Sequence, residues 1–251
     1  MNNNSNKVNA AVIIIGNEIL SGRTREINLA NISLWLNSLG VQVEETRIIP
    51  DIENKIINCV NELRKKYKYV FTSGGIGPTH DDITAESISK AFNLSYEFHK
   101  EAFSILENHY TPGEFNEGRQ KMAKMPSNAT LIYNPTSVAP GFIVENVFCL
   151  PGVPSILKSM LGGLKNKISG GKPILSLTIS LNTVESEIAE PLRNVQNNNK
   201  EVEIGSYPFF KAGKLGVAIV IRSIDKSKID NCNSQILEFV NKKKIEVISK
   251  N

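Results

Sequence analysis

Apolar runs and amphipathic stretches alternate along the first 90 residues. A continuous apolar run at 10–15 predicts a strand that is buried on both faces. Apolar side chains at mainly helical spacing predict a helix over 26–39, which ends at Gly40. The alternation continues with a strand at 41–49, an amphipathic helix through 56–63, a strand at 69–72 and a helix through 85–91. Strands that alternate with helices are typical of a parallel α/β sheet.

The pattern becomes less regular after this repeat. Residues 95–125 predict helical but irregular structure, broken by the Thr-Pro-Gly segment near 111. Short strands are predicted at 129–132 and 141–150, and a tight turn then leads into a helix through 157–164. We expect the first domain to close with that helix.

A glycine-rich segment, 169–173, is the best candidate for a linker, because glycine is permissive and proline cannot continue a helix. Beyond it the pattern predicts strands at 174–181, 202–206, 215–222 and 245–248 and helices at 185–196 and 228–241. We therefore predict two domains, an α/β domain at 8–168 with a mainly parallel sheet and a small α+β domain at 173–251.

The composition agrees with a folded globular protein. Of 251 residues, 41% are hydrophobic and 22% charged, and no apolar run approaches the length of a membrane helix. The first residues lack the apolar core of a secretory signal. Three cysteines stand far apart in no CxxC pattern, which argues against a disulfide framework or a zinc site. We expect a cytoplasmic protein without a membrane partner.

The net charge of +4 is unevenly distributed. Residues 1–163 carry 15 Lys and Arg against 16 Asp and Glu, whereas 164–251 carry 14 against 9. These lysines are scattered and few aromatic residues lie among them, so a solvated surface is favoured over a nucleic-acid patch.

The string Thr72–Thr84 carries most of the candidate chemistry. It follows an apolar strand and contains three glycines, Gly74, Gly75 and Gly77, together with two carboxylates. In a parallel sheet this junction lies at the carboxyl edge, where ligands bind. Glycines let backbone N–H groups approach a phosphate, and the hydroxyls of Thr79 and Thr84 are further candidate substrate contacts.

Two adjacent aspartates in this string, Asp81 and Asp82, would repel a bare phosphate. A divalent metal held by both would bridge them to it, since Mg²⁺ is usually bound by one or two carboxylates plus substrate phosphates. The alternative is that one aspartate caps the next helix and the glycines only make a turn. The length of the string favours a site. It lacks the Gly-Lys-Ser/Thr of a P-loop and the GxGxxG fingerprint, which argues against kinases and Rossmann dehydrogenases.

Other candidates follow neighbouring strands. Glu18 comes directly after the first strand and is a metal ligand, a general base or only a turn cap. Asp51 is either a helix N-cap or a ligand, and His80 is a general acid or a solvated neighbour. Arg119 matches phosphate geometry through its planar guanidinium. The rigid turn that contains Gly152 and Pro154 can present N–H groups to an anion.

Several motifs in order resemble one known family. They are Gly16–Gly22, Asn28, Asp51, Thr72–Thr84, Arg119, Ala139–Phe142 and Leu150–Pro154. Together they resemble the molybdopterin-binding-like domain of the CinA (competence/damage-inducible) family. The chain is also similar to the N-terminal domain of eukaryotic FAD synthases and, more distantly, to the MogA/MoaB molybdenum-cofactor proteins. Residues 185–189 and 204–208 resemble the small domain that follows in CinA and FAD synthase proteins.

The resemblance implies a three-layer α/β domain with its site at the carboxyl ends of the strands. In the CinA and FAD synthase branch, that site is associated with metal-dependent hydrolysis of nucleotide diphosphates such as ADP-ribose or FAD. In the molybdenum-cofactor proteins it holds a pterin that bears a phosphate.

One position favours the hydrolase branch. Asp82 matches the aspartate of the GGTG-type loop in the adenylyltransferase and pterin-binding members, whereas Asp81 stands where those members often have arginine, and a carboxylate there suits a bridging metal. Asn17 departs from the Asp or Thr that is frequent in relatives. We expect a hydrolase that uses Mg²⁺, Mn²⁺ or Co²⁺, with K⁺ as a further cation, in a homo-oligomer. The alternative is a molybdopterin-binding protein without hydrolase activity.

Overall fold

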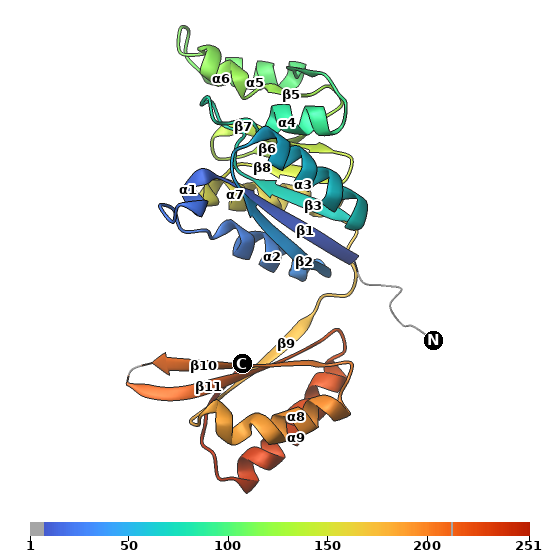
Figure 1. Ribbon diagram of the computed structural model, residues 1–251, viewed down its shortest axis with the longest axis vertical. Helices are drawn as coiled ribbons and strands as arrows, with labels where there is room; N and C mark the ends of the chain where they lie inside the picture. Colours follow the sequence, from blue (N-terminus) through green and yellow to red (C-terminus); the bar gives the residue numbers. More distant parts are fainter. Residues whose placement is uncertain (1–7, 212) are drawn as a thin grey trace. The chain divides into compact units, whose positions relative to one another are not determined.

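The computed structural model describes residues 8–211 and 213–251, which divide after Gly171 into two compact units (Figure 1). Unit 1 is built on a six-stranded sheet in the order β2-β1-β3-β8-β7-β6. Its strands are β1 (Val8–Ile15), β2 (Val41–Ile49), β3 (Tyr69–Ser73), β6 (Thr130–Asn134), β7 (Val138–Val144) and β8 (Val147–Leu150). The four strands β2, β1, β3 and β8 are parallel, and β7 and β6 extend the sheet antiparallel. The predicted mainly parallel α/β sheet is confirmed.

Helices cover both faces of this sheet. Its helical elements are α1 (Asn17–Leu20), α2 (Asn28–Ser38), α3 (Glu53–Lys66), α4 (Thr84–Ala91), α7 (Pro154–Leu161) and the 3₁₀ helix η1 (Gly162–Lys167). Because successive residues of a strand point to opposite faces, Ala11 and Ile13 of β1 pack among α3 and α4, while Ala10 and Val12 pack among α2 and α7. The result is the expected three-layer domain.

The irregular region near residue 110 forms a lobe beside α4. It contains β4 (Tyr96–Phe98), α5 (Lys100–His109), α6 (Glu117–Lys121) and β5 (Lys124–Pro126), and β4 and β5 pair antiparallel. The prediction of helical structure across 95–125 is therefore wrong at both ends. Three-residue strands have too few positions to show a period of two, so the sequence pattern does not reveal them.

Unit 2 is the small α+β domain that the pattern predicts. Its sheet, in the order β10-β11-β9-β12, is antiparallel throughout. Its elements are β9 (Leu175–Leu181), α8 (Glu185–Asn198), β10 (Glu203–Lys211), β11 (Lys214–Ser223), α9 (Lys226–Lys242) and β12 (Val247–Lys250). Among the described helices of either unit, none combines the length and hydrophobicity that crossing a bilayer requires.

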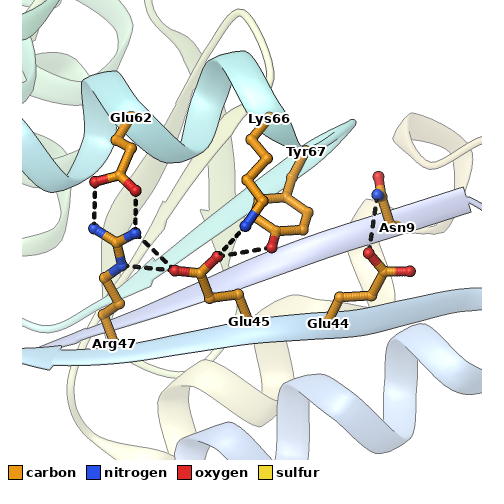
Figure 2. Close-up of polar contacts among 7 residues, drawn as sticks. All are labelled: Asn9, Glu44, Glu45, Arg47, Glu62, Lys66 and Tyr67. Atoms are coloured by element: carbon orange, nitrogen blue, oxygen red, sulfur yellow. Dashed lines mark hydrogen bonds and ion pairs between the residues drawn. The ribbon is translucent and has the colours of Figure 1, made fainter.

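A charged network ties the edge strand β2 to α3 and the residue after it (Figure 2). Glu45 accepts hydrogen bonds from Lys66 Nζ and Tyr67 OH at 2.7 Å each and from Arg47 Nε at 2.8 Å. Arg47 also donates to Glu62 of α3, with Nη1 at 2.6 Å from Oε2. The hydrogen bonds from Lys66, Tyr67 and Arg47 lower the pKa of Glu45 to about 2. Inward-facing charge of this kind also protects an edge strand from pairing with other chains.

Glu45→Gln is expected to lower the stability of unit 1 by about 1 kcal/mol at pH 7. Since the folded-state pKa lies below the ordinary value of 4.5, the contribution is fully present above pH 4.5 and is lost as the pH falls toward 2. Urea unfolding followed by the fluorescence of Trp35, the single tryptophan, should show the difference from wild type shrinking across that range. Glu44→Gln, which alters a neighbouring carboxylate bonded by Asn9, is the control. A difference that is independent of pH would contradict the assignment.

Candidate functional site

The carboxyl ends of β1, β2, β3 and β8 meet at one edge of the sheet, because these four strands are parallel. Hydrogen bonds join the segments that leave them. Gly16 N–H donates to Ile49 O (3.2 Å), and Gly74 N–H donates to Leu150 O (3.0 Å). The predicted candidates that follow these four strands are therefore brought to a common edge.

Asp51 is not the N-cap of the helix that follows β2, so that alternative of the prediction is wrong. The N-cap of α3 is Ile52, which makes no side-chain cap hydrogen bond. The carboxylate of Asp51 instead accepts from the N–H of Asn17 at 2.8 Å, at the start of α1. It therefore fixes the turn after β1 from the end of the neighbouring strand β2.

The glycine loop that follows β3 is shaped by close approaches. Gly74 has φ +109°, and a Cβ there would lie 2.1 Å from the carbonyl oxygen of Ile15. Gly75 has φ +69°, and a Cβ would lie 2.2 Å from Thr84 Oγ1. Thr84 is fully buried, its hydroxyl donating to Gly74 O (3.0 Å) and its N–H to Gly75 O (2.9 Å). In this structure Thr84 holds the loop in shape.

Three consecutive N–H groups in this loop remain free to bind a ligand. Within the described part of the chain, the N–H groups of Gly75, Ile76 and Gly77 have no hydrogen-bond acceptor. Successive unpaired N–H groups with a left-handed residue among them form the kind of concavity that binds anions. This geometry suits an anion such as a phosphate, and the binding of a phosphate by the loop stays a prediction.

Asn28 ties three segments together behind the loop. Its Nδ2 donates to Ser73 Oγ (2.9 Å) and to Gly152 O (2.7 Å). Asn28 is only 6% exposed, and among the described residues its carbonyl oxygen has no partner. Gly152 itself is exposed, and Pro154 follows it at the start of α7. The turn after β8 is thus held against the glycine loop through a side chain of α2.

The two aspartates converge on one hydroxyl. Thr79 Oγ1 lies 2.6 Å from both Asp81 Oδ1 and Asp82 Oδ2, and Thr79 N–H donates to Asp82 Oδ2 at 2.8 Å. The hydrogen bond from Thr79 lowers the pKa of Asp81, with smaller contributions from its own backbone N–H, His80 and Lys121. Neither aspartate caps α4, because its N-cap is Ile83 and makes no side-chain cap hydrogen bond.

These oxygens suit a cation that is shared with a substrate. Across residues 8–211 and 213–251, no three His, Cys, Asp or Glu side chains are grouped so that they could hold a metal ion. Glu18 does not join the two aspartates, and its carboxylate folds over Gly16, where a Cβ would lie 2.5 Å from Oε1. Mg²⁺ commonly takes one or two carboxylates and completes its shell with phosphates and water. Asp81, Asp82 and the Thr79 hydroxyl fit that mode.

A lysine that the sequence did not single out reaches the loop. Arg119 of α6 is engaged within its own lobe, where Nη1 donates to Glu114 O (2.6 Å) and the guanidinium lies 4.1 Å from the ring centroid of Tyr110. Lys121 of the same helix instead donates to the carbonyl oxygen of Thr79. The sequence signal for Lys121 was weak, because it belongs to no motif and is brought to the loop only by the folding of α6.

Known proteins match both units. Residues 11–169 match the family model for the probable molybdopterin binding domain, and residues 173–248 match the model for the middle domain of FAD synthase. A protein of Archaeoglobus fulgidus is 34% identical over 233 residues, which cover 93% of this chain and 98% of that protein. A protein of Saccharolobus islandicus is 36% identical over 173 residues, 66% of each chain.

A solved structure matches about two thirds of the chain. The crystal structure of the protein CinA with unknown function from Thermoplasma acidophilum has 34% sequence identity and a TM-score of 0.61. It covers 65% of this chain and 99% of its own.

Proposed function

The chain belongs to the family of the probable molybdopterin binding domain and is CinA-like, which confirms the resemblance drawn from its motifs, and on this premise we propose that it is a metal-dependent hydrolase of nucleotide pyrophosphates. Its substrates are of the ADP-ribose or FAD type. One observation carries the proposal. Two carboxylates, Asp81 and Asp82, converge on one hydroxyl beside three free N–H groups at the carboxyl edge of the sheet.

Each part of the site has a role in this reaction. The N–H groups of Gly75 and Gly77 bind one phosphate and stabilise the charge that develops on it. Asp81 and Asp82 would hold a divalent cation, which would supply polarisation of the phosphate and a lowered pKa of water. Glu18 accepts the proton of the attacking water. The oxygen of that water bonds to phosphorus as the bridging P–O bond breaks, and AMP and a second phosphate ester leave.

A second candidate function is pterin binding without hydrolysis. It is favoured by the match of residues 11–169 to a probable molybdopterin binding domain. In that case the glycine loop would hold the phosphate of molybdopterin, and the aspartate pair would not turn over a nucleotide. The match of residues 173–248 to a domain of FAD synthase favours the nucleotide instead.

The experiment that tests the proposal is a search for AMP. Purified protein is incubated with ADP-ribose, FAD or NADH and with Mg²⁺, Mn²⁺ or Co²⁺, each with and without K⁺. We expect AMP from at least one substrate with a divalent cation and none with EDTA. If no AMP forms with any metal while molybdopterin binds tightly, the hydrolase is wrong and the second candidate stands.

A further inference from the structure

The segment 76–82, which carries both aspartates, lies outside any helix or strand. Ile76 and Ile83 pack against the core of unit 1 and anchor its two ends. Among the described residues, the other hydrogen bonds of the segment stay inside it, including the one from Asp82 N–H to Thr79 O at 3.3 Å. The single hydrogen bond that reaches it from another part of the described chain comes from the ammonium of Lys121, which donates to Thr79 O. The middle of the segment is therefore tied to the lobe and not to the sheet.

The lobe holds Lys121 at a fixed place beside this segment. Lys121 is the last residue of α6 and is half-buried. Phe115 and Met122, which stand on either side of α6, pack against the core of unit 1. At Gly118 of α6 a Cβ would lie 3.3 Å from Pro78 O. The helix thus meets the segment at two neighbouring carbonyl groups, those of residues 78 and 79.

Thr79 links Lys121 to both aspartates. Its carbonyl oxygen accepts from Lys121, and its hydroxyl oxygen lies 2.6 Å from Asp81 Oδ1 and from Asp82 Oδ2. A shift of Thr79 would therefore move the group on which both carboxylates converge. The charge of Lys121 has the opposite effect, because a positive charge near a cation site weakens cation binding. Loss of the lysine thus weakens cation binding if it positions Thr79, and strengthens it if only its charge matters.

We propose that Lys121 is a positioning residue, which acts through Thr79 to orient Asp81 and Asp82 for a divalent cation. This inference rests on the proposed function and deepens it. Lys121 itself contacts neither the cation nor the substrate. The cation site then depends on the lobe, although the oxygens that would bind the cation all come from one short string of the sequence.

Lys121→Met provides the test, with Mn²⁺ binding measured from the EPR signal of the free ion. Methionine fills a similar volume but cannot donate a hydrogen bond, and we expect the Kd for Mn²⁺ to rise about tenfold. Lys121→Arg can still donate to Thr79 O and should stay within threefold of wild type. Lys100→Met removes an exposed charge at the start of α5 in the same lobe and should change the Kd less than twofold.

Thr79→Val shows whether the effect of Lys121 passes through Thr79. Valine keeps the shape and the backbone carbonyl of threonine but removes the hydroxyl that both aspartates share. Residues that act as one unit are not additive, so Lys121→Met should raise the Kd of the Thr79→Val protein by less than threefold. Trp35 fluorescence checks that each variant is folded. An unchanged or lower Kd for Lys121→Met, the same rise in both backgrounds, or no Mn²⁺ binding by the wild type would overturn the proposal.

Binding and turnover separate this inference from the proposed function. If the wild type forms no AMP yet Lys121→Met weakens Mn²⁺ binding, the positioning role stands and the hydrolase does not. If the wild type forms AMP and Lys121→Met changes neither the Kd for Mn²⁺ nor the Mn²⁺ concentration that gives half the maximal rate, the hydrolase stands and this role is wrong.

Discussion

Asp82→Asn is expected to lower kcat/KM for ADP-ribose by about a hundredfold or more at saturating metal. Asparagine keeps the volume of aspartate, and its Oδ1 can still accept from Thr79 N–H, which now donates to Asp82 Oδ2 at 2.8 Å. The loop therefore keeps its shape while one of the two charges that hold the cation is lost. The measurement is the rate of AMP formation at increasing Mn²⁺ concentration, with unfolding followed by Trp35 fluorescence.

Asp230→Asn is the matched control for this experiment. Asp230 is exposed on α9 of unit 2, so the same chemical change there should leave kcat/KM within twofold. If Asp82→Asn kept kcat/KM within threefold of wild type, the aspartate would have no catalytic role. If it lost the fold as well as the activity, the loop hydrogen bond would be its main contribution.

The fold could be predicted wherever burial alone decides the pattern. The apolar run at 10–15 lies in β1, where Ala10 to Ile13 are fully buried, and the amphipathic helix through 56–63 is α3. The sequence pattern missed β4 and β5, because their pairing depends on a partner nearly thirty residues away rather than on local periodicity. Long elements with a clear hydrophobic period can thus be predicted from the sequence, whereas short strands that depend on a distant partner cannot.

The candidate site could be predicted only where its residues are close together in the sequence. Glycines and aspartates stand together in one string, so the loop could be predicted. Lys121 lies some forty residues further along, and only the folding of the lobe brings it to that loop. The hydrogen bond between Asn17 N–H and Asp51 could not be predicted either. The two residues lie 34 positions apart in the chain, and they meet only because β1 and β2 pair in parallel. A homo-oligomer and a cytoplasmic location stay predictions.

Gly74→Ala is expected to destabilise unit 1 by about 3–5 kcal/mol. Gly74 has φ +109°, a conformation that a residue with a Cβ rarely adopts, and that Cβ would lie 2.1 Å from Ile15 O. The clash is with the backbone of β1, which cannot move away without disturbing its pairing with β3, where Ile14 faces Ser73. Urea unfolding followed by Trp35 fluorescence measures the loss of stability. Trp35 reports on the core of unit 1, because its ring centroid lies 6.1 Å from that of Phe71.

Gly163→Ala separates the effect of position from that of losing a glycine. A Cβ on Gly163 would meet no atom within 4 Å, and its φ is not left-handed. Because alanine restricts the unfolded chain more than glycine does, this variant should be neutral or more stable by up to about 1 kcal/mol. If Gly74→Ala unfolded at the same urea concentration as Gly163→Ala, the loop would have room to rearrange. The tight backbone approach that exposes the N–H groups of Gly75 to Gly77 would then not be needed for the fold.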